Sequence, residues 1–582
     1  MVKFNSDNNK MYVINGVAQT IDVISLDNVK SNDYTNLQKD KSINVAQLVN
    51  SSTFTYGDLT SIDINTKEKV VVVAVQEKDY SKAGKIVVMD YDGNLVKTFD
   101  AGIQPDMVKM TEDGKYILSA NEGEAREGYE NGVDPEGSVT VVNYKEESAK
   151  NIKFDDSSVI DSDIIIRNNT GGAELDLEPE YIDINDDNTK AYVSLQENNA
   201  IATIDIESGK VLSVKSLGFK DHSLEENKLD AGRDDEINLE NLPILGVYMP
   251  DGISHVNIGG VDYILTANEG DATEWAEYSN IAKFSEGKDE ITIDSDLFKG
   301  MTKEELQSKL DEMKSTTKYD KLEVLTNIGT NAIYTLGGRS FSMFKADTME
   351  LVFDSGDDFE QITSQRYPEY FNSSNDEVKL DSRSTKKGPE PEGIEIGQVG
   401  DKIYAFTGLE RIGGVMTYDI TNPNDIKFVN YNNDRDFSTD IGGDSAPEGL
   451  AFIPSSESST GTPLLLVSNE VSGTVAVNEI EGKIVEGGTD KEEKPETEQE
   501  TDKEDNSVNK DEQGNEDFVN KEEYTQNSTN KNEENSKEDN ENQVNEEVGE
   551  LPKTSDAGIL PYVGLGLTGI IGLVIRKFKG SN

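Results

Sequence analysis

The chain has 582 residues and a formal net charge of −59, because 114 Asp and Glu side chains face only 55 Lys and Arg. It contains no cysteine and two histidines, which excludes disulfides, thiolate metal sites, iron–sulfur clusters and the usual three-histidine zinc centres. Its acidity argues against nucleic-acid binding, since that function depends on clustered Lys and Arg. Any chemistry must therefore use carboxylates, hydroxyls, amides and a few arginines.

The first ten residues, MVKFNSDNNK, contain no apolar segment long enough to form a secretory signal peptide. The residues that follow already look like the interior of a repeat. We therefore expect that the sequence starts late and that the export signal is not part of it.

Short strand-like segments separated by Gly, Asn and Asp recur through residues 1–480. Each repeat opens with a Pro-acid or Gly-acid pair, and its second strand ends near Asn-Glu or Gln-Glu. Four short antiparallel strands every roughly 40–50 residues are typical of a β-propeller blade. We predict an all-β propeller of about seven four-stranded blades over residues 1–482, with eight blades as the alternative. The segments that carry the pattern are 10–27, 57–93, 105–144, 179–218, 250–270, 332–356, 391–420 and 447–480.

Two insertions interrupt the repeats. Residues 219–247 are polar and irregular, and residues 271–318 contain a helical pattern. Thr302 with Glu305 three residues later forms a capping box, which predicts that a helix begins there. Its apolar face consists of Leu306, Leu310 and Met313.

Acidic residues recur at two points of most repeats, the start of the first strand and the end of the second. These points lie at the same end of a blade because the two strands are antiparallel. Carboxylates gathered there would raise one another's pKa unless a cation intervened, and oxygen ligands suit calcium. We predict a calcium site; the alternative is that Pro-Glu-Gly and Asn-Glu-Gly are turn sequences with hydrated acids. The pairs are Asp58 with Glu77, Asp106 with Glu122, Glu180 with Glu197, Asp251 with Glu269, Glu392 with Glu410, and Glu448 with Glu470.

Positive charge is scarce, so we predict that Arg126, Arg339 and Arg411 bind an anionic ligand near these acids. Structural salt bridges are the alternative. Trp275, the single tryptophan, is either a binding platform at the acidic end or a core residue. Ser254 and His255 are adjacent on a predicted strand, where alternation points them to opposite faces, so they do not form a catalytic dyad.

Residues 483–550 are rich in acidic and amide side chains and almost free of large apolar residues. Such a segment cannot bury enough apolar surface to offset its loss of conformational entropy. We predict a disordered, acidic linker that holds the propeller away from the surface to which the chain is attached.

Residues 551–582 contain a Leu-Pro-x-Thr motif, an apolar segment over 559–575 and a basic tail. They resemble the cell-wall sorting signal of Gram-positive surface proteins, which sortase cleaves after the threonine and links to peptidoglycan. The motif departs from the pattern because serine replaces glycine at its end. A transmembrane helix that simply anchors the chain in the membrane is the alternative. The motif consists of Leu551, Pro552, Lys553, Thr554 and Ser555.

Several phrases of residues 1–480 resemble the choice-of-anchor I domain family, a group of bacterial surface propellers. They include VINGVAQTIDV (13–23), TANEGDATEW (266–275), TLGGRSFSMF (335–344) and GPEPEGIEIG (388–397). The sequence is also similar to animal proteins named mesenchyme-specific cell surface glycoprotein. The resemblance implies a propeller displayed on the cell surface, without an enzymatic activity that can be transferred.

Three functions remain open at this point. The first is a surface module for binding, adhesion or scaffolding, with divalent cations at the acidic end and an extracellular ligand. The second is a calcium-dependent hydrolase of the phosphoesterase or lactonase type. The third, a purely structural wall protein, would not need the repeated acids.

Overall fold

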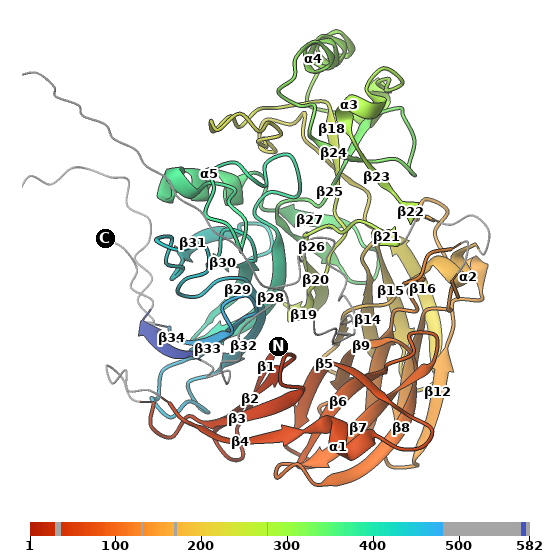
Figure 1. Ribbon diagram of the computed structural model, residues 1–582, viewed down its shortest axis with the longest axis vertical. Helices are drawn as coiled ribbons and strands as arrows, with labels where there is room; N and C mark the ends of the chain where they lie inside the picture. The colour runs from red at the N-terminus through yellow and green to blue at the C-terminus, as the bar shows by residue number, and fades with distance from the viewer. Residues whose placement is uncertain (30–36, 130–131, 168–171, 276–277, 481–571, 578–582) are drawn as a thin grey trace, which may run out of the picture. The chain divides into compact units, whose positions relative to one another are not determined.

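The computed structural model describes residues 1–29, 37–129, 132–167, 172–275, 278–480 and 572–577. Within these residues, seven four-stranded sheets follow one another along the chain (Figure 1). The first three comprise β1 (Val2–Asn5) to β4 (Lys39–Asn44), β5 (Tyr56–Asn65) to β8 (Leu95–Ile103), and β9 (Pro105–Met110) to β12 (Ser148–Ile152). Between their ends lie β2 (Lys10–Asn15), β3 (Thr20–Ser25), β6 (Val70–Glu77), β7 (Ala83–Asp90), β10 (Tyr116–Asn121) and β11 (Ser138–Asn143).

The other four sheets have the same order of strands. The fourth comprises β13 (Ile182–Ile184), β14 (Lys190–Leu195), β15 (Ala200–Asp205) and β16 (Lys210–Ser216). The fifth comprises β19 (Ile253–Ile258), β20 (Val261–Ala267), β26 (Phe341–Lys345) and β27 (Leu351–Asp354). The sixth comprises β28 (Pro391–Val399), β29 (Lys402–Leu409), β30 (Val415–Asp419) and β31 (Lys427–Asn432). The seventh comprises β32 (Pro447–Ile453), β33 (Leu464–Asn469), β34 (Thr474–Glu479) and β35 (Gly572–Lys577).

Adjacent strands are antiparallel in all seven sheets, except that β35 pairs parallel to β34. Residues 572–575 of the predicted apolar segment therefore form a strand and not part of a helix. Among the described residues, no helix is long and apolar enough to cross a membrane. The predicted linker, the sortase motif and the rest of the apolar segment lie outside these residues.

The sheets close into a ring through apolar layers between successive sheets. One layer packs Val72 and Val88 of the second sheet against Val108 and Ile117 of the third. The last layer joins the seventh sheet to the first, where Leu464 and Leu466 pack with Val2, Met11 and their neighbours. A strand between two such layers is buried on both faces, which is why β6 reads as a continuous apolar run. This closed ring of four-stranded sheets is the architecture of a β-propeller.

The eight predicted repeat segments correspond to seven sheets, because two of the segments, separated in the sequence, form one sheet together. Residues 250–270 supply β19 and β20, whereas residues 332–356 supply β26 and β27 of the same sheet. β20 and β26 pair directly, with Ala267 opposite Phe341. The long segment between them is therefore an insertion at the end of a hairpin.

The insertions form a separate apolar core. Short strands β17 (Phe219–Asp221), β18 (Ile244–Val247) and β25 (Ile333–Leu336) make one sheet, and β23 (Ile281–Lys283) pairs with β24 (Glu323–Leu325). The predicted helix is α4 (Lys303–Ser315), which begins with the capping box of Thr302 and Glu305. Leu310 and Met313 of α4 pack with Phe284 of α3 (Phe284–Gly287). The remaining helices are α1 (Val45–Val49), α2 (Ala173–Asp176) and α5 (Asp358–Arg366), with short 3₁₀ turns at Ser157–Val159, Ser295–Leu297 and Pro368–Tyr370.

Candidate functional site

One end of the ring, which we call the mouth, is where each first strand begins and each second strand ends. The antiparallel order of strands within the sheets fixes this arrangement. The connections from β16 to β19, from β20 to β26 and from β27 to β28 also start and end there. The insertions are therefore placed to contribute side chains to the mouth.

In the Asn-Glu-Gly turns at the mouth, asparagine and glycine have structural roles that differ from that of the glutamate. Asn121 Nδ2 donates to the Ser138 carbonyl at 3.0 Å, so this asparagine joins its strand to the next one. Gly123 and Gly270 have φ values of +75° and +87°, and a Cβ on Gly270 would lie 2.2 Å from the Gly337 nitrogen. Asparagine and glycine therefore build the turn, and the glutamate between them remains available to the mouth.

Carboxylates from several sheets influence one another at the mouth. Burial raises the pKa of Glu180 well above its ordinary value, and Glu197, Glu122 and Asp251 add to this effect. Burial likewise raises the pKa of Glu392, with contributions from Glu448, Glu410, Glu269 and Asp251. The predicted acids of the third to seventh sheets thus lie within electrostatic range of one another.

The outer members of the predicted set are less involved. Glu77 Oε2 accepts a hydrogen bond from the Thr55 amide at 2.9 Å, which ties it to its own sheet. Glu470 is exposed, although it still influences the pKa of half-buried Glu448. Burial raises the pKa of Asp58, and the Arg126 guanidinium opposes that effect.

Two of the three predicted arginines lie among these acids. Arg126 contacts Glu124 at 2.9 Å, Glu122 at 3.3 Å and the Gln76 side chain at 3.1 Å. Arg411 contacts Glu390 at 2.8 Å and Glu410 at 2.9 Å. Salt bridges, the alternative left open by the sequence, are therefore present at both arginines.

The prediction that Arg339 binds a ligand is not supported by its contacts. Arg339 is 3% exposed, and its Nη1 lies 2.9 Å from Glu360 Oε1. The same guanidinium donates to the carbonyl oxygens of Asp230, Ser384 and Lys386 at 2.7–2.8 Å. These acceptors occupy its donors, so Arg339 joins the insertion to the loop that follows α5.

Trp275 lies in β21 (Glu274–Trp275), which pairs with β22 (Tyr278–Ser279). It is partly exposed and belongs to none of the apolar clusters formed by the described residues, so a core role is not supported.

His255 stacks on Tyr192, and its Nε2 lies 3.1 Å from Asp262 Oδ1. This histidine is therefore held by neighbours on and beside its own sheet.

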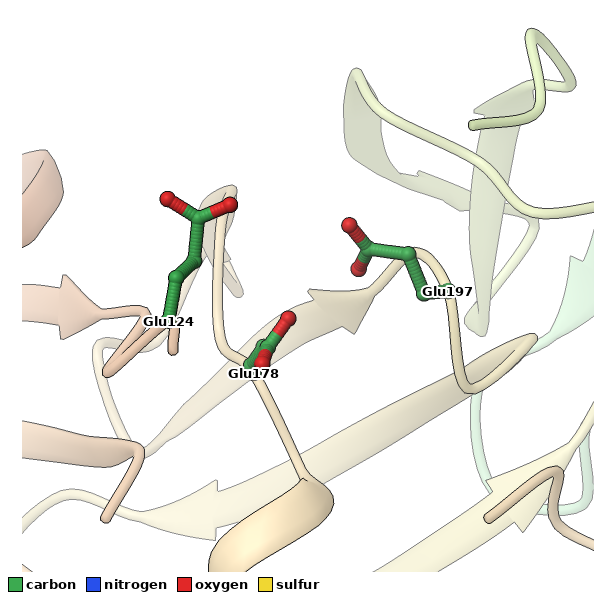
Figure 2. A group of neighbouring side chains, drawn as sticks. All are labelled: Glu124, Glu178 and Glu197. Atoms are coloured by element: carbon green, nitrogen blue, oxygen red, sulfur yellow. The ribbon is translucent and has the colours of Figure 1, made fainter. Parts of the chain in front are cut away.

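Three glutamates form a close group, which we call the first cluster: Glu124, Glu178 and Glu197. They come from three segments, after β10, before β13 and after β14, and their side chains point toward a shared space (Figure 2). One carboxylate oxygen of each lies within 4.8 Å of those of the other two. Of these three residues, Glu197 alone was predicted from the sequence.

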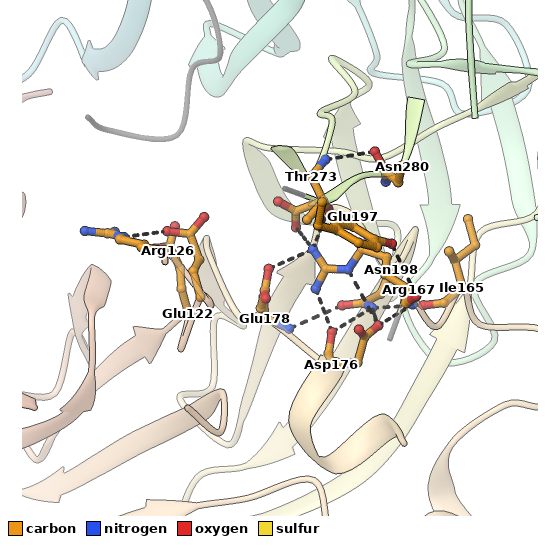
Figure 3. A network of polar contacts seen from close by, with 12 residues as sticks. Glu122, Arg126, Ile165, Arg167, Asp176, Glu178, Glu197, Asn198, Thr273 and Asn280 are labelled. Atoms are coloured by element: carbon orange, nitrogen blue, oxygen red, sulfur yellow. Dashed lines mark hydrogen bonds and ion pairs between the residues drawn. The ribbon is translucent and has the colours of Figure 1, made fainter. Parts of the chain in front are cut away.

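Arg167, which was not predicted from the sequence, is the central cation of the first cluster. Its Nη1 lies 2.8 Å from Glu178 Oε2 and 3.7 Å from Glu197 Oε2, and its Nε lies 3.6 Å from Asp176 (Figure 3). Its side chain has no exposed surface. Arg167 therefore ties the chain before α2 to the mouth.

A second cluster comprises Glu269, Glu390 and Glu410, whose oxygens also lie within 4.8 Å of one another. Lys387 Nζ contacts Glu269 at 2.7 Å and Glu390 at 3.1 Å, and Arg383 also pairs with Glu390. Glu390, Lys387 and Arg383 were not predicted from the sequence. A usable signal was present, because Glu178-Pro179-Glu180 and Glu390-Pro391-Glu392 are the same tripeptide placed before a first strand.

The two clusters offer oxygen atoms only, which suits a hard divalent cation such as Ca²⁺. The fit is best beside the first cluster, where Glu180 is 7% exposed and its Oε2 accepts no hydrogen bond from the described residues. A buried carboxylate that lacks a hydrogen-bond donor needs a bound proton or a cation to offset the cost of burying its charge. The residues present therefore fit a bound metal ion.

The metal-free protein should lose stability as the pH rises, and Asp106 allows this to be measured. Burial and Glu124 raise the pKa of Asp106 to about 7, against the effect of Arg126. The folded state then keeps a proton that the unfolded chain has lost, so stability falls between about pH 4 and pH 7. Urea unfolding in chelator should show Asp106→Asn about 1–2 kcal/mol more stable than wild type at pH 7.5, and similar at pH 4. Asp347→Asn, at an exposed position, is the control; an unchanged pH slope in Asp106→Asn would contradict the prediction.

A ring of four-stranded sheets with buried carboxylates gathered at one mouth defines an acidic β-propeller. The model of the choice-of-anchor I domain family matches residues 1–423. The chain belongs to this family, which agrees with the resemblance of its motifs.

Two animal proteins are similar in sequence. Gigasin-3a of Magallana gigas is 31% identical over 183 residues, which are 28% of this chain and 64% of that protein. The mesenchyme-specific cell surface glycoprotein of Strongylocentrotus purpuratus is 30% identical over 278 residues, which are 42% of this chain and 35% of that protein. The aligned regions thus span less than two thirds of either relative.

Solved structures resemble the fold only distantly. Kuenenia stuttgartiensis hydrazine synthase aligns with a TM-score of 0.42 at 10% identity, covering 82% of this chain and 94% of that chain. The Cps50 (Swd1) β-propeller domain of Myceliophteria thermophila aligns with a TM-score of 0.38 at 7% identity, covering 81% and 92%. At these scores, neither carries an argument about function.

Proposed function

We propose that this protein is a cell-surface binding module that uses the mouth of its propeller, with bound Ca²⁺, to hold an extracellular ligand. Family membership and the name of the sea urchin relative support a position on the cell surface. The observation that carries the binding role is Glu180, a buried carboxylate among other carboxylates whose Oε2 finds no donor in the described part of the chain. A bound cation would offset the free-energy cost of burying this carboxylate and would remain accessible to a ligand.

Attachment through residues 551–582 belongs to the same proposal. Sortase would join Thr554 to peptidoglycan of a Gram-positive cell and release residues 555–582, so that β35 would leave the seventh sheet. Thr554→Ala should abolish covalent attachment to purified cell wall. Unchanged attachment in this variant would leave only the membrane anchor.

Calcium should stabilise the full chain after treatment with chelator. A ligand that binds only the folded state adds about 2.7 kcal/mol at a hundredfold excess over its Kd. Thermal unfolding should therefore shift upward in millimolar Ca²⁺. The double variant Glu122→Gln, Glu269→Gln should lose part of this shift, because Glu122 lies next to Glu180 and the two substitutions lower the negative potential at the mouth.

The matched control is Glu522→Gln with Glu523→Gln, which changes the charge equally in the predicted linker. Unfolding that does not respond to calcium would contradict the proposal and favour hydrated turn acids. A panel of glycans, phosphoesters and lactones, tested with the calcium-loaded protein, separates binding from hydrolysis. Turnover of a phosphoester or lactone would favour the hydrolase and overturn the binding role.

A further inference from the structure

The first and second clusters are built in the same way in different sheets. Each contains the glutamate that opens a Glu-Pro-Glu tripeptide before a first strand, Glu178 or Glu390. Each adds the glutamate that follows the second strand of the same sheet, and an acid that follows the second strand of the preceding sheet. These pairs are Glu197 and Glu124 in the first cluster, and Glu410 and Glu269 in the second.

The clusters differ in the cations that occupy them. In the second cluster, the Lys387 ammonium lies between two of the three glutamates, at 2.7 Å from Glu269 and 3.1 Å from Glu390. In the first cluster, Arg126 contacts Glu124, and Arg167 approaches the other two glutamates from the side of α2. Among the described residues, no lysine makes an ion pair with any member of the first cluster.

The electrostatic balance differs accordingly. Against the effect of burial, Arg383, Arg411 and Lys387 hold the pKa of Glu390 well below its usual range. Burial raises the pKa of Glu178 well above its usual range, and Glu197 adds to this, although Arg167 opposes the rise. The second cluster is therefore neutralised by its own side chains, whereas the first retains an excess of negative charge.

A separate observation points to a ligand at the first cluster. Glu180, at the end of the same Glu-Pro-Glu tripeptide, is more than nine-tenths buried and lies next to Glu197 and Glu122. Its Oε2 accepts no hydrogen bond from a nitrogen or hydroxyl donor of the described structure, and Glu197 Oε2 has only a long contact to Arg167. The two carboxyl groups lie within hydrogen-bond range of each other, so a divalent cation there would replace a proton held between them.

We infer that one divalent cation binds between Glu124, Glu178, Glu180 and Glu197, and that the Lys387 ammonium takes the equivalent place in the second cluster. This inference rests on the proposed function and makes it specific. The mouth would then have two parts: the first cluster, whose charge is balanced by a bound metal ion, and the second cluster, whose charge is balanced by the Lys387 ammonium. Ca²⁺ is the expected ion because it accepts six to eight oxygen ligands in flexible geometry, with water completing the shell.

Calorimetric titration of the chelator-treated full chain with CaCl₂ tests the inference. The wild type should bind with a stoichiometry near one. Glu180→Gln with Glu197→Gln should weaken binding roughly tenfold or more, because ligand charge sets affinity at such sites. The matched control is Glu392→Gln with Glu410→Gln, the equivalent residues of the sixth sheet, and it should bind as the wild type does.

Lys387→Met provides a gain-of-function test, because it should open the second cluster and raise the calcium stoichiometry toward two.

Terbium luminescence measures cation binding to the wild type, so it needs no glutamate variant. Tyr278 donates to the Arg167 carbonyl at 3.3 Å and stacks edge-on with Tyr129 at 4.8 Å, so one bound Tb³⁺ should be sensitised by tyrosine. Circular dichroism in chelator establishes that each variant is folded.

The outcomes separate the inference from the proposed function. Calcium binding that survives in Glu180→Gln with Glu197→Gln and is lost in the control would overturn the inference, while the mouth would remain a cation site. A stoichiometry that stays at one in folded Lys387→Met would overturn the assignment of Lys387 as a resident cation. A wild type that binds neither Ca²⁺ nor Tb³⁺ would overturn both proposals.

Discussion

Replacing Arg167 by Met should lower the free energy of unfolding by about 3–5 kcal/mol. The guanidinium is buried against Asp176, Glu178 and Glu197, and its removal leaves carboxylates without their central counter-charge. Urea unfolding followed by circular dichroism measures the loss. Calcium should recover part of it, because the cation would supply the missing positive charge at the first cluster.

Lys427→Met is the control for the Arg167 variant. Lys427 pairs with Asp425 at 2.9 Å, but both side chains are more than half exposed. Exposed pairs contribute about 0–1 kcal/mol, so this variant should remain close to the wild type. A loss in Arg167→Met no larger than that in the control would mean that the network around Arg167 does not stabilise the fold.

Glu390→Gln should also lower the free energy of unfolding by about 3–5 kcal/mol. Here buried cations lose a carboxylate, whereas in Arg167→Met buried carboxylates lose a cation. Glu390 has no exposed surface and balances Arg383, Lys387 and Arg411, so the substitution leaves buried cations without their shared partner. Its carboxyl pKa lies well below the ordinary value, so its contribution is present at neutral pH and is lost only as the pH falls through that low pKa.

Calcium should not restore the stability of Glu390→Gln, which distinguishes it from the Arg167 variant. Glu457→Gln, at an exposed position, is the matched control for the change of charge. Equal stability of Glu390→Gln and Glu457→Gln would contradict the balance of charges assigned to the second cluster.

Much of the ring could be predicted from local sequence patterns. Strands such as β6 are continuous apolar runs bounded by turn residues, and the Asn-Glu-Gly turns mark where second strands end. The number of sheets was harder to predict, because residues 250–270 and 332–356 are separated in the sequence but share one sheet. Pairing between distant strands leaves no local signal, so residues 250–270 looked like one repeat and residues 332–356 like a partial copy of another.

The acids at the mouth were predictable because antiparallel pairing alone brings Glu180 and Glu197 to the same end of a sheet. Their cations were not, since Arg167, Arg383 and Lys387 lie in irregular segments between sheets. The path of such segments depends on tertiary packing. The surroundings of Arg339 were unpredictable for the same reason, because the loop after α5, distant in sequence, folds over it and supplies its acceptors.

The central claim is that the buried carboxylates of the mouth hold a divalent cation. Anomalous diffraction from crystals grown with Tb³⁺ in place of Ca²⁺ tests it most directly. One strong peak is expected among Glu124, Glu178, Glu180 and Glu197, with carboxylate oxygens at about 2.3–2.6 Å. No peak there, together with a hydrogen-bonded, protonated Glu180, would show that these acids are neutral structural residues and would contradict the account.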